Sequence, residues 1–156
     1  MRDETEDDDI VVQITDDFKE LEVDRAALAR LVKAICKRFS LKRATVGIAI
    51  VDDAQIRRLN KQFLECDDTT DCLSFDLSDD TESYRSFELL VNGRMAIRQA
   101  ELRGHSAQAE LALYVTHGIL HNLGFDDGEE TQAKKMHRTE DEILQQQGYG
   151  PVYNSE

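Results

Sequence analysis

Residues 116–127 read THGILHNLGFDD, in which two histidines are followed by a glycine and a pair of aspartates. His117 and His121 are four residues apart, so on a helix they lie on the same face and both imidazoles can reach one ion. Gly124 can take the left-handed conformation that ends a helix, after which the chain reverses. That reversal can bring Asp127 to the same ion as a third ligand. The stretch therefore predicts a metal site at the end of a helix, held by His117, His121 and Asp127.

The ligand spacing is that of the zinc-hydrolase motif H-E-x-x-H-x-x-G-x-x-H, with two differences. Gly118 stands in the place of the general-base glutamate, and Asp127 stands in the place of the third histidine. Without the glutamate, the site lacks the proton acceptor that peptide hydrolysis uses, which argues against a protease. A carboxylate in place of a neutral imidazole favours harder ions such as Mn²⁺. Two alternatives remain open: Asp126 competes as the third ligand, and Asp127 can instead cap the following helix.

Composition indicates a single globular domain in a reducing, cytoplasmic setting. The chain has 156 residues, of which 40% are hydrophobic and 33% are charged, and no apolar run is long enough to span a membrane. Its three cysteines lack the spacing of a metal ribbon, so no disulfide framework is expected. Six of the first nine residues are acidic. We therefore expect residues 1–9 to form a disordered acidic tail, residues 10–150 the domain, and residues 151–156 a C-terminal tail.

The net charge of −13 argues against a broad basic surface for nucleic acid. Any RNA must be bound at a local patch, through a metal ion, or with help from a partner.

Periodicity predicts alternating strands and helices. Apolar, β-branched runs indicate strands, and apolar residues three or four apart indicate amphipathic helices. The predicted strands are 10–14, 44–51, 72–75 and 88–97, the last containing a turn or bulge at Asn92-Gly93. The predicted helices are 24–40, 52–63, 98–104, 106–123 and 129–147, with residues 78–86 as an exposed loop.

Four segments of the chain form a pattern that extends beyond the histidine motif: Leu59-Asn60 with Phe63, then TDCLSF at 70–75, then HGILHNLGFD at 117–126, and finally Met136, Glu140, Ile143 and Gly148. Together these segments resemble the YbeY family of bacterial rRNA maturation factors. They occur in the family's order and spacing over roughly residues 10–150. This match is more specific than the histidine motif alone.

The resemblance implies an α+β fold, with a small mixed β-sheet flanked by helices and a central metal-binding helix of the zincin-like kind. It implies a single-strand-specific, metal-dependent endoribonuclease that acts in 16S rRNA 3′ end maturation and ribosome quality control. The implied cofactor is one divalent ion, with Zn²⁺ expected and Mn²⁺ or Ni²⁺ as alternatives. The implied partners are single-stranded rRNA and the small ribosomal subunit or a ribosomal protein.

By family position, the catalytic residues are His117, His121 and Ser74, and both Ser74 and Asp71 lie beside the cleft. The family carries arginine after the aromatic at Phe63, where this chain has Leu64. Two other readings therefore stay open: a metal-binding, ribosome-associated accessory protein with weak or no cleavage, and a metalloprotease-like hydrolase.

Several charged residues outside the motif are further candidates. His105 and His137 are expected at the surface, not among the ligands. The candidate phosphate contacts are Arg57, Arg58, Lys61, Arg94 and Arg98.

Overall fold

A computed structural model describes residues 9–79, 84–126 and 128–150 as four strands and five helices. In chain order they are β1 (Asp9–Asp16), α1 (Arg25–Arg38), β2 (Arg43–Val51), α2 (Asp53–Leu64), β3 (Cys72–Asp76), β4 (Arg85–Asn92), α3 (Gly93–Arg103), α4 (Ala107–Asn122) and α5 (Glu130–Gln146). The predicted tails fall on residues outside this description, except that Asp9 already belongs to β1. The α+β class predicted from the sequence is confirmed.

The four strands form one mixed sheet in the order β1-β2-β4-β3. β1 and β2 are parallel, β2 and β4 are parallel, and β3 runs antiparallel to β4 at the sheet edge. β2 is buried along most of its length, as its apolar, β-branched sequence predicts. β3 is short, and it is the edge strand beside which the histidine-bearing helix lies.

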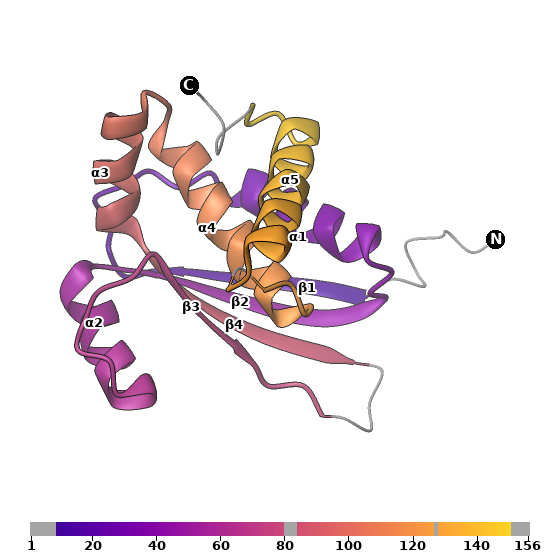
Figure 1. Ribbon diagram of the computed structural model, residues 1–156, viewed down its shortest axis with the longest axis horizontal. Coiled ribbons are helices and arrows are strands. Elements are labelled where there is room, and N and C mark those ends of the chain that lie inside the picture. The colour runs from indigo at the N-terminus through magenta and orange to yellow at the C-terminus, as the bar shows by residue number, and fades with distance from the viewer. Residues whose placement is uncertain (1–8, 80–83, 127, 151–156) are drawn as a thin grey trace.

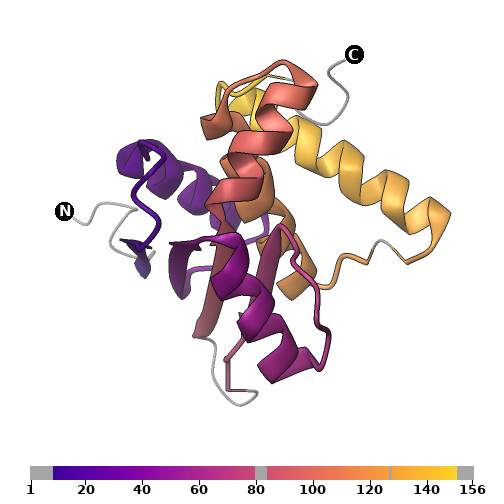
Figure 2. The same cartoon turned by 90° about the vertical axis from the view of Figure 1, so that its left-hand side faces the viewer.

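Alternate residues of the strands face two different layers. One face packs against α1, α4 and α5 and contains the main core, which includes Ile48, Phe87 and Leu89. The other face carries a smaller cluster of Val51, Leu73 and Ile56, the last contributed by α2. Figure 1 shows α1, α4 and α5 on one side of the sheet and α2 on the other. In Figure 2, α3 lies beside α4, with which it makes direct contacts.

The helix α4 is the centre of the fold. Buried residues lie around most of the circumference of the helix, and they include Leu111, Val115 and Ile119. Its N-terminus is capped by Ser106, whose hydroxyl accepts from the Ala109 N–H at 3.0 Å. Among the helices that the structure describes, none has both the length and the apolar character needed to cross a membrane.

The prediction of a strand across residues 88–97 is wrong, because β4 ends at Asn92 and α3 begins at Gly93. Asn92 is the N-cap of α3, and its side chain accepts from the Met95 N–H at 2.9 Å. A Cβ at Gly93 would lie 2.6 Å from a ring carbon of Phe18, so the sharp change from strand to helix needs glycine there. The Asn-Gly pair thus starts a helix instead of a turn within a strand.

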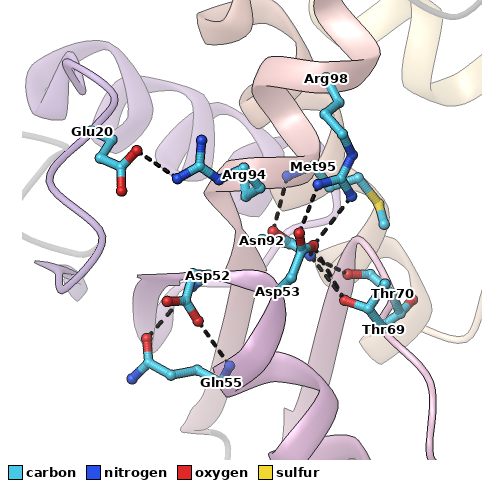
Figure 3. Close-up of polar contacts among 10 residues, drawn as sticks. All are labelled: Glu20, Asp52, Asp53, Gln55, Thr69, Thr70, Asn92, Arg94, Met95 and Arg98. Atoms are coloured by element: carbon cyan, nitrogen blue, oxygen red, sulfur yellow. Dashed lines mark hydrogen bonds and ion pairs between the residues drawn. The ribbon is translucent and has the colours of Figure 1, made fainter.

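Asn92 also joins three segments that surround the start of β3 (Figure 3). Its amide nitrogen lies 2.8 Å from Asp53 Oδ1, 3.1 Å from Thr69 Oγ1 and 3.1 Å from the Thr70 carbonyl oxygen. Arg98 donates to both Asp53 oxygens at 2.6 and 3.2 Å, and this contact lowers the pKa of the Asp53 carboxyl. The network holds the loop that leads into β3 against α2 and α3.

Candidate metal centre

The two histidines of α4 converge as their spacing predicts. The Nε2 atoms of His117 and His121 are 3.1 Å apart, with the ring planes nearly perpendicular at 84°. Two imidazoles bound to one tetrahedral zinc at about 2.0–2.1 Å would place their nitrogens about 3.3 Å apart. The pair is therefore close to the separation that a shared ion requires.

Glu140 orients the His117 ring through the ring nitrogen that faces away from His121. Its carboxylate Oε2 lies 2.6 Å from His117 Nδ1, and the Glu140 side chain is fully buried in α5. A carboxylate can only accept, so His117 carries its proton on Nδ1 and presents the lone pair of Nε2 to the neighbouring His121. A carboxylate on the second nitrogen of a ligating histidine is the usual outer partner in protein zinc sites. This donor set fits a divalent ion such as Zn²⁺.

The third ligand is not found among the described residues. Within them, no three His, Cys, Asp or Glu side chains are grouped so that they could hold an ion. Asp127, the predicted third ligand, lies outside the described part of the chain. Asp126 is exposed, and its Oδ1 accepts from the Gly128 N–H at 2.9 Å in a local turn.

The reversal after α4 forms as predicted. Gly124 has φ +102°, the Gly124 N–H donates to the His121 carbonyl, and the Phe125 N–H donates to the Leu120 carbonyl at 3.0 Å. This turn ends α4.

Gly118 is explained by the approach of β3 to α4. A Cβ at position 118 would lie 2.9 Å from Cys72 Sγ, 2.9 Å from a methyl carbon of Leu89 and 3.5 Å from the Ser74 Cβ. A glutamate, which the zinc-hydrolase motif has at this position, would require the Cys72 and Leu89 side chains to shift. The same contact places Ser74, which is half-buried, on the side of β3 that faces α4.

A pocket of about 380 Å³ opens beside His117. Its polar lining is contributed by four segments: Asp71 before β3, Gln99 and Arg103 from α3, Tyr114 from α4 and His137 from α5. The expectation that Asp71 lies beside the cleft agrees with this geometry. Ser74 packs against α4 without being part of the pocket wall that His117 and Asp71 share.

The surface placement expected for His105 is wrong. The His105 side chain is only 14% exposed, and its Nε2 lies 2.5 Å from Oε1 of the fully buried Glu110. His137 is half-buried and lines the pocket. His105 lies between α3 and α4 and pairs with a residue five positions along the chain, whereas the position of His137 depends on the packing of α5 beside α3 and α4.

Three of the candidate phosphate contacts are engaged in ion pairs with carboxylates. Arg57 pairs with Asp67 at 2.9 Å, Arg94 with Glu20 at 2.5 Å, and Arg98 with Asp53 at 2.6 Å. The sequence reading missed Arg103, the arginine that lines the pocket beside His117. It also missed Glu140 as a partner of His117, although a glutamate on the apolar stripe of α5 was a visible signal.

Comparison with known proteins identifies the family of this chain. The family described as Endoribonuclease YbeY matches residues 13–148. A protein named Endoribonuclease YbeY from Carboxydothermus hydrogenoformans is 32% identical over 136 residues, covering 86% of this chain and 95% of the relative. One of the same name from Pelotomaculum thermopropionicum is 39% identical over 109 residues, covering 66% and 72%.

The solution structure of TM1509 from Thermotoga maritima is similar in fold, with a TM-score of 0.57 and 22% identity. The alignment covers 87% of this chain and 91% of that one. The family match runs from the second half of β1 to the end of α5 and includes both histidines and Glu140. By this match and these identities, the chain belongs to the endoribonuclease YbeY family.

Proposed function

We propose that this protein is a metal-dependent, single-strand-specific endoribonuclease that acts in 16S rRNA 3′ end maturation and ribosome quality control. The observation that carries the proposal is the pair of imidazoles converging at 3.1 Å, with a buried carboxylate behind one of them. The relatives' name, Endoribonuclease YbeY, supplies the substrate class. The proposed partners are single-stranded rRNA and the small ribosomal subunit or a ribosomal protein, in the cytoplasm.

The proposed cofactor is one divalent ion, Zn²⁺ in the first instance and Mn²⁺ or Ni²⁺ as alternatives. His117 and His121 would hold it through Nε2, and Asp127 is the proposed third ligand. Such an ion supplies Lewis acidity for a phosphoryl oxygen and for an attacking water. The remaining steps depend on what the protein's own residues position around the scissile phosphate.

Glu140 keeps the His117 ring in one tautomer and one orientation, because its carboxylate holds the Nδ1 proton at 2.6 Å. Gly118 allows β3 to approach α4, so Ser74 is placed within reach of the histidine-bearing helix as a proposed catalytic residue. The same close approach disfavours a glutamate base at position 118. A site without that base is poorly suited to peptide hydrolysis, which supports RNA over protein as the substrate.

A second candidate function is an accessory protein that binds metal and ribosomal components with little cleavage. Two large apolar side chains that are adjacent in the chain, Phe63 and Leu64, are 55% and 57% exposed at the end of α2. Exposed apolar side chains next to each other favour contact with a protein partner. This candidate predicts metal binding without RNA cleavage.

Cleavage of defined substrates separates these functions. The purified full-length protein would be incubated with a single-stranded RNA, the same RNA in a duplex, and a denatured protein substrate, each with and without a chelator. We expect chelator-sensitive cleavage of the single-stranded RNA only, and loss of that cleavage in His121→Ala. The matched control is Arg94→Gln, which removes a side chain of α3 that pairs with Glu20, and it should cleave like the wild type. Metal binding without cleavage would support the accessory role instead.

A further inference from the structure

The pocket beside His117 has a polar wall of mixed charge. Arg103 and Gln99 provide hydrogen-bond donors, while Asp71 provides a carboxylate that accepts. Its volume of about 380 Å³ lies within the range of pockets that take small organic ligands. A ligand that fits this wall has both an anionic group and hydrogen-bond donors of its own.

Arg103 is held in the wall by a carboxylate that lies behind it. Its Nη1 lies 3.2 Å from Glu110 Oε2, and Glu110 is fully buried while the Arg103 side chain is 39% exposed. The other Glu110 oxygen is 2.5 Å from His105 Nε2, so both oxygens have partners. A guanidinium has five N–H donors, and this ion pair uses one of them. The remaining donors are available to an anion in the pocket.

Tyr114 adds a second polar group to the same pocket. The residue is 3% exposed, and its hydroxyl lies near the Glu110 carboxylate. Burial, the Glu110 charge and the side-chain contact with Glu110 raise the pKa of the Tyr114 hydroxyl, so it stays protonated. A hydroxyl has two acceptor lone pairs besides its proton, so a ligand in the pocket can still donate to it.

The net negative charge of the protein gives the position of Arg103 a particular importance for binding an anion. At a net charge of −13, the protein must bind a phosphodiester strand through local cations. Arg94 and Arg98, on the same helix, are paired with partly exposed carboxylates and do not line the pocket beside His117. Arg103 combines a buried partner with a place in the wall that also contains His117.

We propose that this pocket is a subsite for one nucleotide of the RNA strand, next to the phosphate presented to His117 and His121. Arg103, positioned by Glu110, binds the phosphate of that nucleotide. Asp71 lies in the same wall, and its charge repels a phosphate, so it accepts from a ribose hydroxyl or a base amine instead. Gln99 and Tyr114 complete the polar contacts. This subsite rests on the proposed endoribonuclease function and names how its substrate is held.

The test compares two arginines of α3 that differ in position but not in charge. Arg103→Gln removes the pocket cation, and Arg94→Gln removes a cation of the same helix outside the pocket. Binding of a labelled single-stranded RNA ten nucleotides long would be measured by fluorescence anisotropy on the full-length protein with chelator, so that no cleavage interferes. Inorganic phosphate would be added as a competitor.

We expect Arg103→Gln to weaken RNA binding by about tenfold, as for the loss of one charge-assisted contact, and Arg94→Gln to change it less than twofold. In cleavage assays with metal, Arg103→Gln should raise KM while kcat changes by less than about threefold. Phosphate alone should compete weakly, because it fills only the arginine end of the pocket. If phosphate displaces the RNA at low concentration, the site is an anion site and the nucleotide subsite is overturned.

Arg103→Lys controls for a loss of stability caused by the substitution itself, because lysine keeps a positive charge beside Glu110 but lacks the planar set of donors. An intermediate RNA affinity is expected for it, with a thermal midpoint near that of the wild type. Equal affinities of Arg103→Gln and Arg94→Gln would overturn the subsite while leaving the endoribonuclease function intact. A wild-type protein that neither binds nor cleaves single-stranded RNA would overturn both.

Discussion

Replacing Asn92 by alanine should lower the free energy of unfolding substantially, although the residue lies at the end of a strand. The side chain caps α3 through the Met95 N–H, a contact typically worth about 1 kcal/mol. Its amide nitrogen also contacts the Thr70 carbonyl and Asp53, and leaving a buried acceptor without a partner costs about 1–3 kcal/mol. Asp53 keeps its contacts to Arg98, so only part of the amide contribution is lost. The expected total is about 2–4 kcal/mol.

Urea unfolding followed by circular dichroism would measure this loss, with an unchanged m-value as evidence that only stability has changed. The matched control is Asn122→Ala, because the Asn122 amide nitrogen is buried without a hydrogen-bond partner among the described residues. We expect that control to lose less than about 1 kcal/mol. Asn92→Asp keeps the cap acceptor but puts a second carboxylate beside Asp53.

That repulsion raises the pKa of the new carboxyl in the folded state, so the destabilisation of Asn92→Asp relative to wild type should be smaller at acidic than at neutral pH. An Asn92→Ala protein within about 0.5 kcal/mol of the wild type would refute the reasoning. An Asn92→Asp protein as stable as the wild type at neutral pH would refute it equally.

Four further predictions concern the core and the site. Gly118→Ala should lose about 1 kcal/mol in urea unfolding, since overpacking costs about 1–3 kcal/mol and the better helix propensity returns about 1, and a gain in stability would contradict the close approach of β3. Glu140→Gln should weaken Zn²⁺ binding by roughly tenfold or more in competition with a chromophoric chelator, and unchanged affinity would remove its orienting role. Burial raises the pKa of the Cys36 thiol from 9.0 to about 11, so the neutral thiol is favoured by folding and stability should fall as pH rises from 9 to 11. Cys36→Ala should flatten that part of the pH–stability curve, and an unchanged slope would contradict the assignment. The dependence of RNA affinity on salt should lose about 0.7 of its log–log slope in Arg103→Gln, the amount expected for one phosphate contact on a single strand.

Local sequence patterns were sufficient to predict the features that depend on residues of a single segment. The i, i+4 histidines, the apolar circumference of α4 and the left-handed Gly124 all follow from residues within one segment, and the structure has them as predicted. The order of strands and helices was also recovered for most of the chain. These features depend on backbone geometry and on burial within a single element.

The features that were missed depend on residues far apart in the chain. Asn92-Gly93 carries a turn signal, but the Asn92 side chain caps α3 through the Met95 N–H and is held in place by Asp53 and Thr70 from other segments. Glu140 is 23 residues from His117, and nothing local pairs them. A charged residue on the apolar face of a helix indicates that its side chain has a buried partner, but it does not identify that partner.

The character of the proposed site is set by the edge strand as much as by the histidine motif. β3 and β4 run so close to α4 that a Cβ at position 118 would lie 2.9 Å from Cys72 Sγ on β3 and 2.9 Å from a methyl carbon of Leu89 on β4, so a glutamate there would require these side chains to shift. β3 is in turn fixed by the loop that Asn92 holds against α2 and α3. That same loop carries Asp71 into the pocket beside His117. The close packing around Gly118, which disfavours a peptidase-type base, and the pocket wall against which we propose that a nucleotide lies therefore both depend on this loop. A variant that weakens the contacts of the loop should change both properties together.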